Sequence, residues 1–292
     1  MKTTTKAHLA VLGTNFFFAA NYTFIKYISP ALIRPYALNV ARVGGSLILF
    51  WIMWLMSKTS ARIQKQHIGR FLLCGLTGVA INQTLFIKGI TLTSTIHASL
   101  LVLATPLVIT VIAFWALKER LNLAKGAGLL LGISGAALLV ATKESSQHAS
   151  NYLLGDLLIL INSISYGAYF ILVKPLMRAY SPLHVIRWVF VFGFLMILPF
   201  GWHEASEIPW GQFNATHFLS LFAIVFTGTF LAYYFTAYGL QHLGAGVTGT
   251  YIYTQPFFAV LISMIVLSEV LTVQKLLAAA LIFSGVYLVN RK

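Results

Sequence analysis

Polar side chains recur at helical spacing inside one of the apolar stretches of this chain. Asn162, Tyr166 and Tyr169 occupy positions i, i+4 and i+7, so a helix brings them to one face. An amide or a phenol surrounded by hydrocarbon is costly unless it meets a polar partner. These tyrosines lie too centrally in their segment for an aromatic belt at a membrane surface. The pattern therefore favours the wall of a polar cavity between helices.

Other apolar segments carry the same chemistry, which predicts a cavity rich in phenols, amides and hydroxyls. For Asn21 the alternative is a structural hydrogen bond between helices, and for His97 it is a neutral, hydrogen-bonded histidine near the outer surface. Asn82 and Gln83 are adjacent and point about 100° apart, so only one of them faces a given cavity squarely. The predicted substrate-binding residues are Asn21, Tyr22, Asn82, Gln83, His97, Asn162, Tyr166, Tyr169, Tyr233, Tyr251 and Gln255.

Few groups in these segments could carry a proton. His97 is a candidate to carry a proton, and Asp156 is either a coupling site for a proton or cation or a cap for the helix that it begins. Glu119 and Glu269 lie between segments, and we expect each of them to stabilise the N-terminus of the helix that follows. With Cys74 as the only cysteine and the histidines dispersed, we expect no catalytic residues, no metal site and no cofactor.

The predicted cavity suits a modest-sized, partly apolar solute. Neutral or zwitterionic amino acids, aromatic metabolites and cationic drugs fit it best, because aromatic faces stack on rings or meet an ammonium group. A phosphorylated substrate would need two or more inward-facing bases. Arg42 and Arg187 lie inside apolar segments, but we expect carbonyls or lipid phosphates, rather than substrate, to be their partners.

The composition shows what must position these side chains. The chain has 292 residues and a formal net charge of +14, yet only 9% of its residues are charged and 59% are hydrophobic. Soluble domains average about 25% charged residues, so a soluble enzyme, a nucleic-acid-binding domain and a disordered protein are all excluded. The fold class is therefore an all-α integral membrane protein. Its ten predicted membrane helices cover residues 7–27, 35–56, 68–88, 93–117, 124–142, 153–173, 183–201, 215–238, 246–267 and 273–290.

The distribution of basic residues predicts the orientation. With ten helices, thirteen of the twenty Lys and Arg residues fall on the side of both termini and five on the other side. Basic residues are enriched in cytoplasmic loops, so both termini are expected in the cytoplasm. The loop at about 202–214, which carries Glu204 and Glu207 and no base, is then an outer loop.

The chain also repeats itself. Residues 89–140 align with 239–290 without a gap, with eleven of 52 positions identical, including Pro106 with Pro256 and Glu119 with Glu269. This predicts two five-helix domains, at 1–145 and 150–292. Five is an odd number, so the second domain enters the membrane inverted, an arrangement that places a substrate site at the midplane and permits alternating access.

Small residues indicate how the last helix of each half packs. Gly128 and Gly132 are four residues apart, as are Ala280 and Ser284, and such spacing allows helices to approach closely. We expect packing within the chain first. The protein is accordingly predicted to be a monomer, with a homodimer as the alternative.

Short motifs in the two halves resemble the EamA domain of the drug/metabolite transporter superfamily. They are Ala20–Lys26, Asn82-Gln83, Thr105-Pro106, Lys118–Leu121 and Gly132–Gly135 in the first half, and Tyr233-Tyr234, Gln255-Pro256, Ser268–Leu271 and Phe283–Gly285 in the second. The resemblance implies ten helices, with the cavity lined mainly by the first, third, fourth, sixth, eighth and ninth and with the fifth and tenth as a peripheral scaffold. It also implies export of amino acids, related metabolites or drugs from bacteria.

The leading hypothesis is a secondary transporter in a bacterial cytoplasmic membrane, surrounded by lipid and exporting amino acids or similar small molecules by alternating access. No Walker A motif is present, so ATP is not expected to drive it directly. The alternatives are uptake of a nucleobase, sugar or vitamin, an integral-membrane enzyme, and a membrane protein that transports nothing. No nucleic-acid partner is expected.

Overall fold

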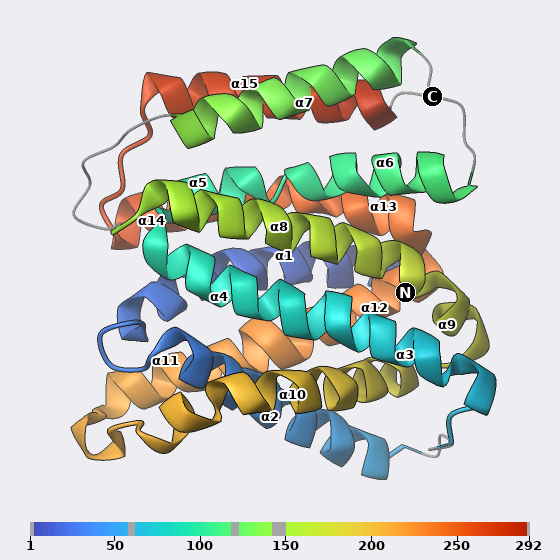
Figure 1. Ribbon diagram of the computed structural model, residues 1–292, viewed down its shortest axis with the longest axis vertical. Coiled ribbons are helices and arrows are strands. Elements are labelled where there is room, and N and C mark those ends of the chain that lie inside the picture. The colour runs from blue at the N-terminus through green and yellow to red at the C-terminus, as the bar shows by residue number, and fades with distance from the viewer. Residues whose placement is uncertain (1–2, 58–61, 118–122, 142–149, 291–292) are drawn as a thin grey trace.

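The computed structural model describes residues 3–57, 62–117, 123–141 and 150–290, and within these ranges it is helical with no strand (Figure 1). The connections between helices are short, because few polar residues separate the apolar segments of the sequence. The helices are α1 (Thr3–Ile28), α2 (Pro35–Leu55), α3 (Ile68–Gly75), α4 (Asn82–Leu92), α5 (Thr95–Leu101), α6 (Ala104–Leu117), α7 (Leu123–Ala141), α8 (Tyr152–Leu172), α9 (Lys174–Ala179), α10 (Pro182–Ser206), α11 (Ala215–Val225), α12 (Ala232–His242), α13 (Gly244–Thr250), α14 (Thr254–Val266) and α15 (Val273–Asn290).

Seven helical runs among the described residues are long and apolar enough to cross a bilayer, which confirms a helical membrane protein. They cover Pro35–Leu55, Lys65–Leu92, Thr95–Ile112, Tyr152–Ala179, Pro182–Ser206, Ala215–His242 and Gly244–Val266. Shorter apolar stretches lie in α7 and α15. The predicted break near residue 243 is confirmed, because α12 ends at His242 and Gly244, with a φ of 80° that favours glycine, begins α13.

Three short irregular helices interrupt these runs at related places. The π-helical segments η2 (Leu76–Ile81) and η4 (Phe226–Leu231) lie 150 residues apart, the same offset as the sequence repeat. A third interruption follows the same offset, since the break between α5 and α6 corresponds to the 3-10 turn η5 (Tyr251–Tyr253). Backbone irregularities thus recur with the repeat, and π-helical turns are frequent at functional sites.

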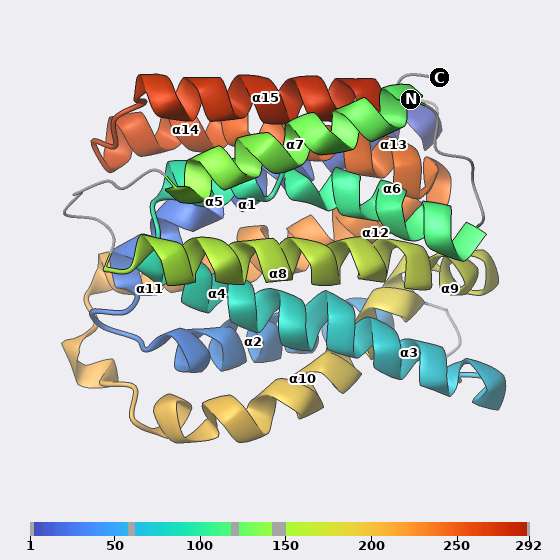
Figure 2. The ribbon, with the colours of Figure 1, turned by 45° about the horizontal axis from the view of Figure 1, so that its top comes forward.

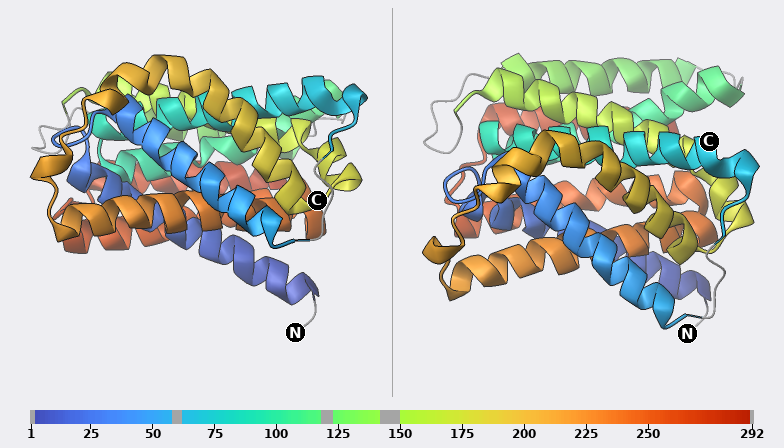
Figure 3. Two further views of the ribbon diagram at one scale, coloured as in Figure 1. Left: turned by 90° about the horizontal axis from the view of Figure 1, so that it is seen from below. Right: turned by 60° about the horizontal axis from the view of Figure 1, so that its bottom comes forward.

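The helices form a bundle with two paired edges. Figures 1 and 2 show α7 and α15 side by side at one edge, and α2 and α10 packed together at the opposite edge. The helices α1, α4, α8 and α12 lie between these pairs. Figure 3 shows the first turns of α1 projecting from the bundle. The resemblance implied this peripheral place for the fifth and tenth helices, and it leaves the central helices to enclose the interior.

The contact between α7 and α15 depends on small residues. A side chain at Gly285 would meet the backbone of Gly128 and Gly132, and one at Gly135 would meet Ile282 and the carbonyl oxygen of Ala278. The expectation that Ala280 and Ser284 make this contact is wrong, because both are exposed. The face of α15 toward α7 is instead occupied by Ala278, Ile282 and Gly285.

Two carboxylates cap helices that are distant in the sequence. Glu269 accepts hydrogen bonds from the backbone N–H groups of Thr95 (2.8 Å) and Ile96 (3.0 Å). The expectation that it stabilises the following helix is therefore wrong: it caps α5, in the other half of the chain. The connection between α14 and α15 reaches the N-terminus of α5, where unpaired N–H groups favour a negative charge. Glu119 lies outside the described residues.

Glu204 has the same role at α2. Its Oε2 accepts hydrogen bonds from the N–H groups of Tyr36 (2.9 Å) and Ala37 (3.2 Å). It was expected in a loop, but α10 continues to Ser206 and carries Glu204 on its last turns. Both carboxylates thus join segments that are more than 160 residues apart.

Candidate functional site

A buried cavity of about 50 Å³ lies among the central helices. Its wall is formed by eleven side chains from α1, α2, α4, α8, α12 and α14 and from the break between α5 and α6. They are Phe18, Tyr22, Arg42, Asn82, Gln83, Phe86, Val102, Asn162, Tyr166, Tyr233 and Gln255. Seven of the eleven predicted substrate-binding residues belong to this wall, and α2 contributes in addition to the six helices that the resemblance implied.

The irregular helices position several of these side chains. Gln83 follows the π-helical segment η2 closely, and Tyr233 follows η4 at the corresponding place. An extra residue in a turn shifts the helical phase after it. Asn82 and Gln83 both line the cavity, although only one of them was expected to face it squarely.

Hydrogen bonds fasten three of the lining helices together. The Asn162 amide donates to the carbonyl oxygen of Asn82 at 2.6 Å, and the Asn82 amide donates to the carbonyl oxygen of Asn162 at 3.4 Å. The Tyr233 hydroxyl donates to Oδ1 of Asn82 at 3.0 Å. These contacts connect α4, α8 and α12, so part of the predicted polar chemistry holds the cavity wall in place.

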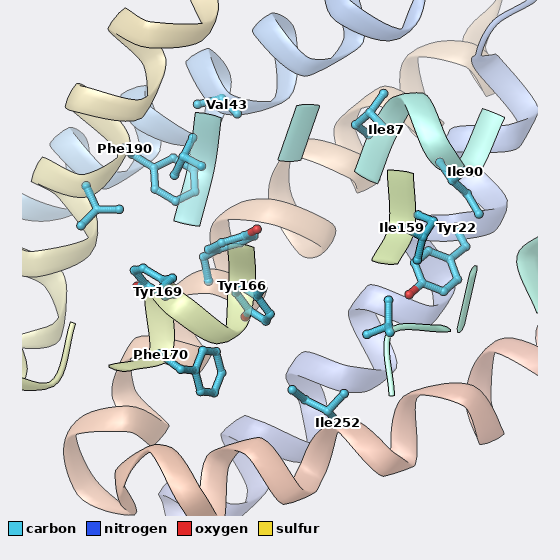
Figure 4. Packing of buried hydrophobic residues seen from close by; sticks show 14 of the residues in the cluster. Tyr22, Val43, Ile87, Ile90, Ile159, Tyr166, Tyr169, Phe170, Phe190 and Ile252 are labelled. Atoms are coloured by element: carbon cyan, nitrogen blue, oxygen red, sulfur yellow. The ribbon is translucent and has the colours of Figure 1, made fainter. Parts of the chain in front are cut away.

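Aromatic rings also contribute to the wall. The Tyr22 hydroxyl accepts a hydrogen bond from Gln255, which joins α1 to α14, and the Tyr22 ring lies 5.2 Å from that of Phe86. The Tyr233 ring makes an edge contact with Phe18 at 5.6 Å. Figure 4 shows Tyr22 on α1 and Tyr166 on α8 on different sides of this interior. An aromatic wall of this kind suits an apolar or aromatic body of a solute.

Arg42 belongs to the wall, although carbonyls or lipid phosphates were expected as its partners. Instead it is 1% exposed, its Nε donates to Oγ1 of Thr229 at 3.0 Å, and its guanidinium group lines the cavity. Its depth within an apolar segment was the available signal, because such an arginine faces the interior of a bundle rather than lipid.

Four predicted site residues do not belong to the cavity wall. Asn21 packs against Gly228 in η4, and Tyr169 packs against Gly78 in η2. Tyr251 accepts or donates a hydrogen bond at 2.8 Å with Nδ1 of His8. His97, the fourth, lies nearer the end of the bundle at which α4 ends and α8 begins.

At that end the two predicted coupling residues meet. His97 Nδ1 lies 3.0 Å from Oδ2 of Asp156, and Oδ1 of the same carboxylate accepts a hydrogen bond of 2.5 Å from the Thr93 hydroxyl. Both His97 and Asp156 are fully buried. Asp156 was also considered as a cap for its own helix, but its carboxylate instead joins α8 to α5 and to the connection before α5.

Charged groups surround this pair, which we call the Asp156–His97 pair. Lys26 Nζ donates to the carbonyl oxygen of Thr93 at 2.6 Å, and Glu269 binds the N-terminus of α5 two residues before His97. The ring of Tyr152 lies 5.0 Å from that of His97. His97 Nε2 has no hydrogen-bond partner within the part of the chain that the structure describes. The arrangement thus brings a carboxylate and an imidazole together in a buried place.

Among the described residues no three His, Cys, Asp or Glu side chains gather where they could hold a metal ion. Cys74 is a buried free thiol.

The model of the EamA-like transporter family matches this chain twice, at residues 5–141 and 153–291. Among relatives, the uncharacterized transporter YetK of Bacillus subtilis is 25% identical over 83% of this chain and 74% of its own length. An uncharacterized transporter of Archaeoglobus fulgidus is 25% identical over 94% and 95%. A probable terminal-alkyne amino-acid exporter of Streptantibioticus cattleyicolor is 28% identical over 75% and 72%.

The fold also matches a solved protein. A crystal structure superimposes with a TM-score of 0.65 over 98% of this chain and 96% of the other, at 19% sequence identity. At that identity the likeness concerns the fold alone.

Proposed function

Because this chain belongs to the EamA-like transporter family, we propose that it is a secondary transporter that exports amino acids or related small metabolites by alternating access. The observation that carries the proposal is the buried polar cavity, whose wall takes side chains from both family matches. A relative named as a probable amino-acid exporter supports the substrate class.

We propose ten membrane spans in two inverted domains, at 1–145 and 150–292, with both termini in the cytoplasm of a bacterial cell. The seven long apolar runs account for most of these spans, and α1, α7 and α15 supply the others. The irregular segments that recur 150 residues apart support the repeat. Inverted halves let one bundle rock against the other around a central site.

The structure supports a path that opens at the proposed cytoplasmic end. A groove of about 410 Å³ lies there between α1 and α12, lined by Lys6, Leu9, Ala10, Tyr234, Phe235 and Tyr238. At the opposite end, Glu269 and the Asp156–His97 pair join the two halves through buried contacts. The central cavity of about 50 Å³ holds only a few water molecules, so it must widen before it admits an amino acid.

For the source of energy we propose a proton. The Asp156–His97 pair lies at the end that must open to release an exported solute, and its carboxylate is shared between α8 and α5. The charged and the protonated carboxylate would hold this contact with different strengths and would therefore favour different conformations. Coupling of this kind needs a group whose two protonation states prefer different conformations.

Transport assays test the proposal with two matched tyrosines. Purified protein in proteoliposomes is expected to move labelled amino acids, and Tyr166→Ala is expected to lower that flux by about tenfold because it removes a ring from the cavity wall. Tyr251→Ala is the control, since it removes a tyrosine that lies outside the wall, and it is expected to change flux by less than about twofold.

Two results would contradict the proposal. Equal losses in the two variants would show that the described cavity is not the site. Failure to move any solute in a panel of amino acids, nucleobases, sugars and vitamins would overturn export itself.

A further inference from the structure

The cavity contains one formal charge. Arg42 is the single charged residue of its wall, and among the described residues Arg42 forms no ion pair with any carboxylate. An arginine keeps its proton under physiological conditions. A buried charge is costly unless it is paired, so an uncompensated cation in a binding cavity favours a ligand with a negative group.

Among the described residues, the guanidinium group of Arg42 uses only some of its hydrogen-bond donors. Its Nε donates to Oγ1 of Thr229 at 3.0 Å, and that hydroxyl donates in turn to the carbonyl oxygen of Ile224 at 2.8 Å. Nη1 of Arg42 is buried and has no hydrogen-bond partner among the described residues. The side chain is thus fixed through Nε, while Nη1 keeps a donor that a carboxylate could accept from.

The other buried arginine has a different environment. Arg187 is loosely equivalent to Arg42 in the repeat, and its guanidinium carbon lies 4.6 Å from the ring centre of Trp51 and 4.2 Å from that of Trp54. These aromatic faces offset its charge. Arg187 lies outside the cavity wall and no such ring contact involves Arg42 among the described residues, so of these two buried arginines only Arg42 is placed to meet a ligand in the cavity.

Gln83 offers a second place for a polar group beside this charge. Its side chain is 1% exposed, lines the same cavity and lies beside the Tyr233 phenol. An amide can both donate and accept hydrogen bonds, so it can serve a ligand that carries groups of both kinds. An ammonium group on the solute would donate to Oε1.

Resting on the transport function proposed above, we infer that Arg42 binds the carboxylate of the transported solute, which is a monocarboxylate with an apolar or aromatic body. One guanidinium balances one negative charge, whereas a phosphate monoester would leave a second charge unpaired in a wall without another base. Organic cations are excluded, because Arg42 repels them and no acidic residue lines the cavity to bind them. The cationic drugs that the sequence pattern admitted are therefore removed from the expected substrates.

Ligands matched in shape test this assignment on purified full-length protein in detergent. L-Phenylalanine and 3-phenylpropionate carry the carboxylate and phenethylamine lacks it, and L-leucine with isoamylamine provides the same contrast for a smaller body. Thermal-shift titration is expected to show at least tenfold tighter binding of each carboxylate than of its amine. A charge-assisted hydrogen bond supports a difference of that size.

Three variants locate the effect. Arg42→Gln is expected to remove the preference for the carboxylate ligands. Thr229→Val leaves the charge but removes its anchor, and it is expected to weaken carboxylate binding by about threefold or more even if Arg42→Gln does not yield folded protein. Arg187→Gln removes the caged arginine outside the cavity and is expected to keep the wild-type preference.

Binding in detergent and flux in proteoliposomes separate this inference from the transport proposal. A carboxylate preference that depends on Arg42, without flux of any ligand, would support the assignment and overturn transport. If the protein transports phenethylamine as well as it transports L-phenylalanine, the transport proposal stands and the assignment of Arg42 is overturned. A preference retained in both Arg42→Gln and Thr229→Val would also overturn it.

Discussion

Asp156→Asn is expected to abolish the response of transport to a pH gradient while leaving folded protein in the membrane. The substitution keeps the shape of the side chain and its hydrogen bond from Thr93, but an amide does not take up a proton at physiological pH. In the wild type, a gradient of one pH unit corresponds to about tenfold in accumulation for each proton coupled. The variant is expected to show equal flux with and without the gradient.

The groups around Asp156 decide what the variant changes. His97 contacts the carboxylate from α5, Lys26 reaches Thr93 from α1, Glu269 binds the start of α5, and Tyr152 lies over His97. Removing the carboxylate charge leaves Lys26 near Thr93 and Glu269 at the helix start, so the other contacts at this end are retained. The expected effect is therefore on coupling rather than on folding.

An exposed carboxylate at the same end provides the control. Glu207 pairs with Arg34 at 3.0 Å, with side-chain exposures of 49% and 63%. Exposed pairs of this kind contribute little to stability. Glu207→Gln is expected to keep the full response to the gradient, and a full response in Asp156→Asn as well would exclude Asp156 as the coupling group.

Gly285→Val is expected to lower the midpoint of thermal unfolding by roughly 5–10 °C, because the added side chain would meet the backbone of α7 at Gly128 and Gly132. Backbone atoms do not move aside as a flexible side chain does. Overpacking of this kind typically costs about 1–3 kcal/mol and sometimes more. The change is measured by heating the detergent-solubilised protein and monitoring the loss of folded protein by size-exclusion chromatography.

Gly126 on α7 offers a matched control on the same helix pair. A side chain added there meets no atom within 4 Å. Gly126→Val is expected to shift the midpoint by less than about 2 °C, since only the helix propensity changes. Similar midpoints for Gly285→Val and Gly126→Val would contradict close packing of α7 against α15.

Several features of the cavity were predictable because helical periodicity is local. Asn162 and Tyr166 share a face by spacing alone, and both line the cavity. Tyr169 fits the same spacing, but it fills the space that Gly78 leaves in the π-helical segment of a different run. A sequence pattern places a side chain on a face of its helix and does not say which neighbour that face meets.

Contacts between segments that are distant in the sequence could not be predicted from local spacing. Glu269 was expected to cap the helix that comes next in the sequence, whereas it caps α5 from 174 residues away. Any helix start offers unpaired N–H groups, so local chemistry predicts the role of such a carboxylate but not its partner. The partner depends on which helix ends the fold brings together.

From the sequence alone followed the helical membrane class, the family, most of the helix boundaries and the polar character of a central cavity. These properties depend on composition and on spacing along single helices, and both are properties of the chain itself. The tertiary structure decided that Arg42 lines the cavity while Arg187 is enclosed by tryptophans, and that His97 and Asp156 lie 3.0 Å apart. The two arginines are alike in type and in depth within their helices, and only the packing of neighbouring helices determines whether a buried charge meets an aromatic ring or an empty space.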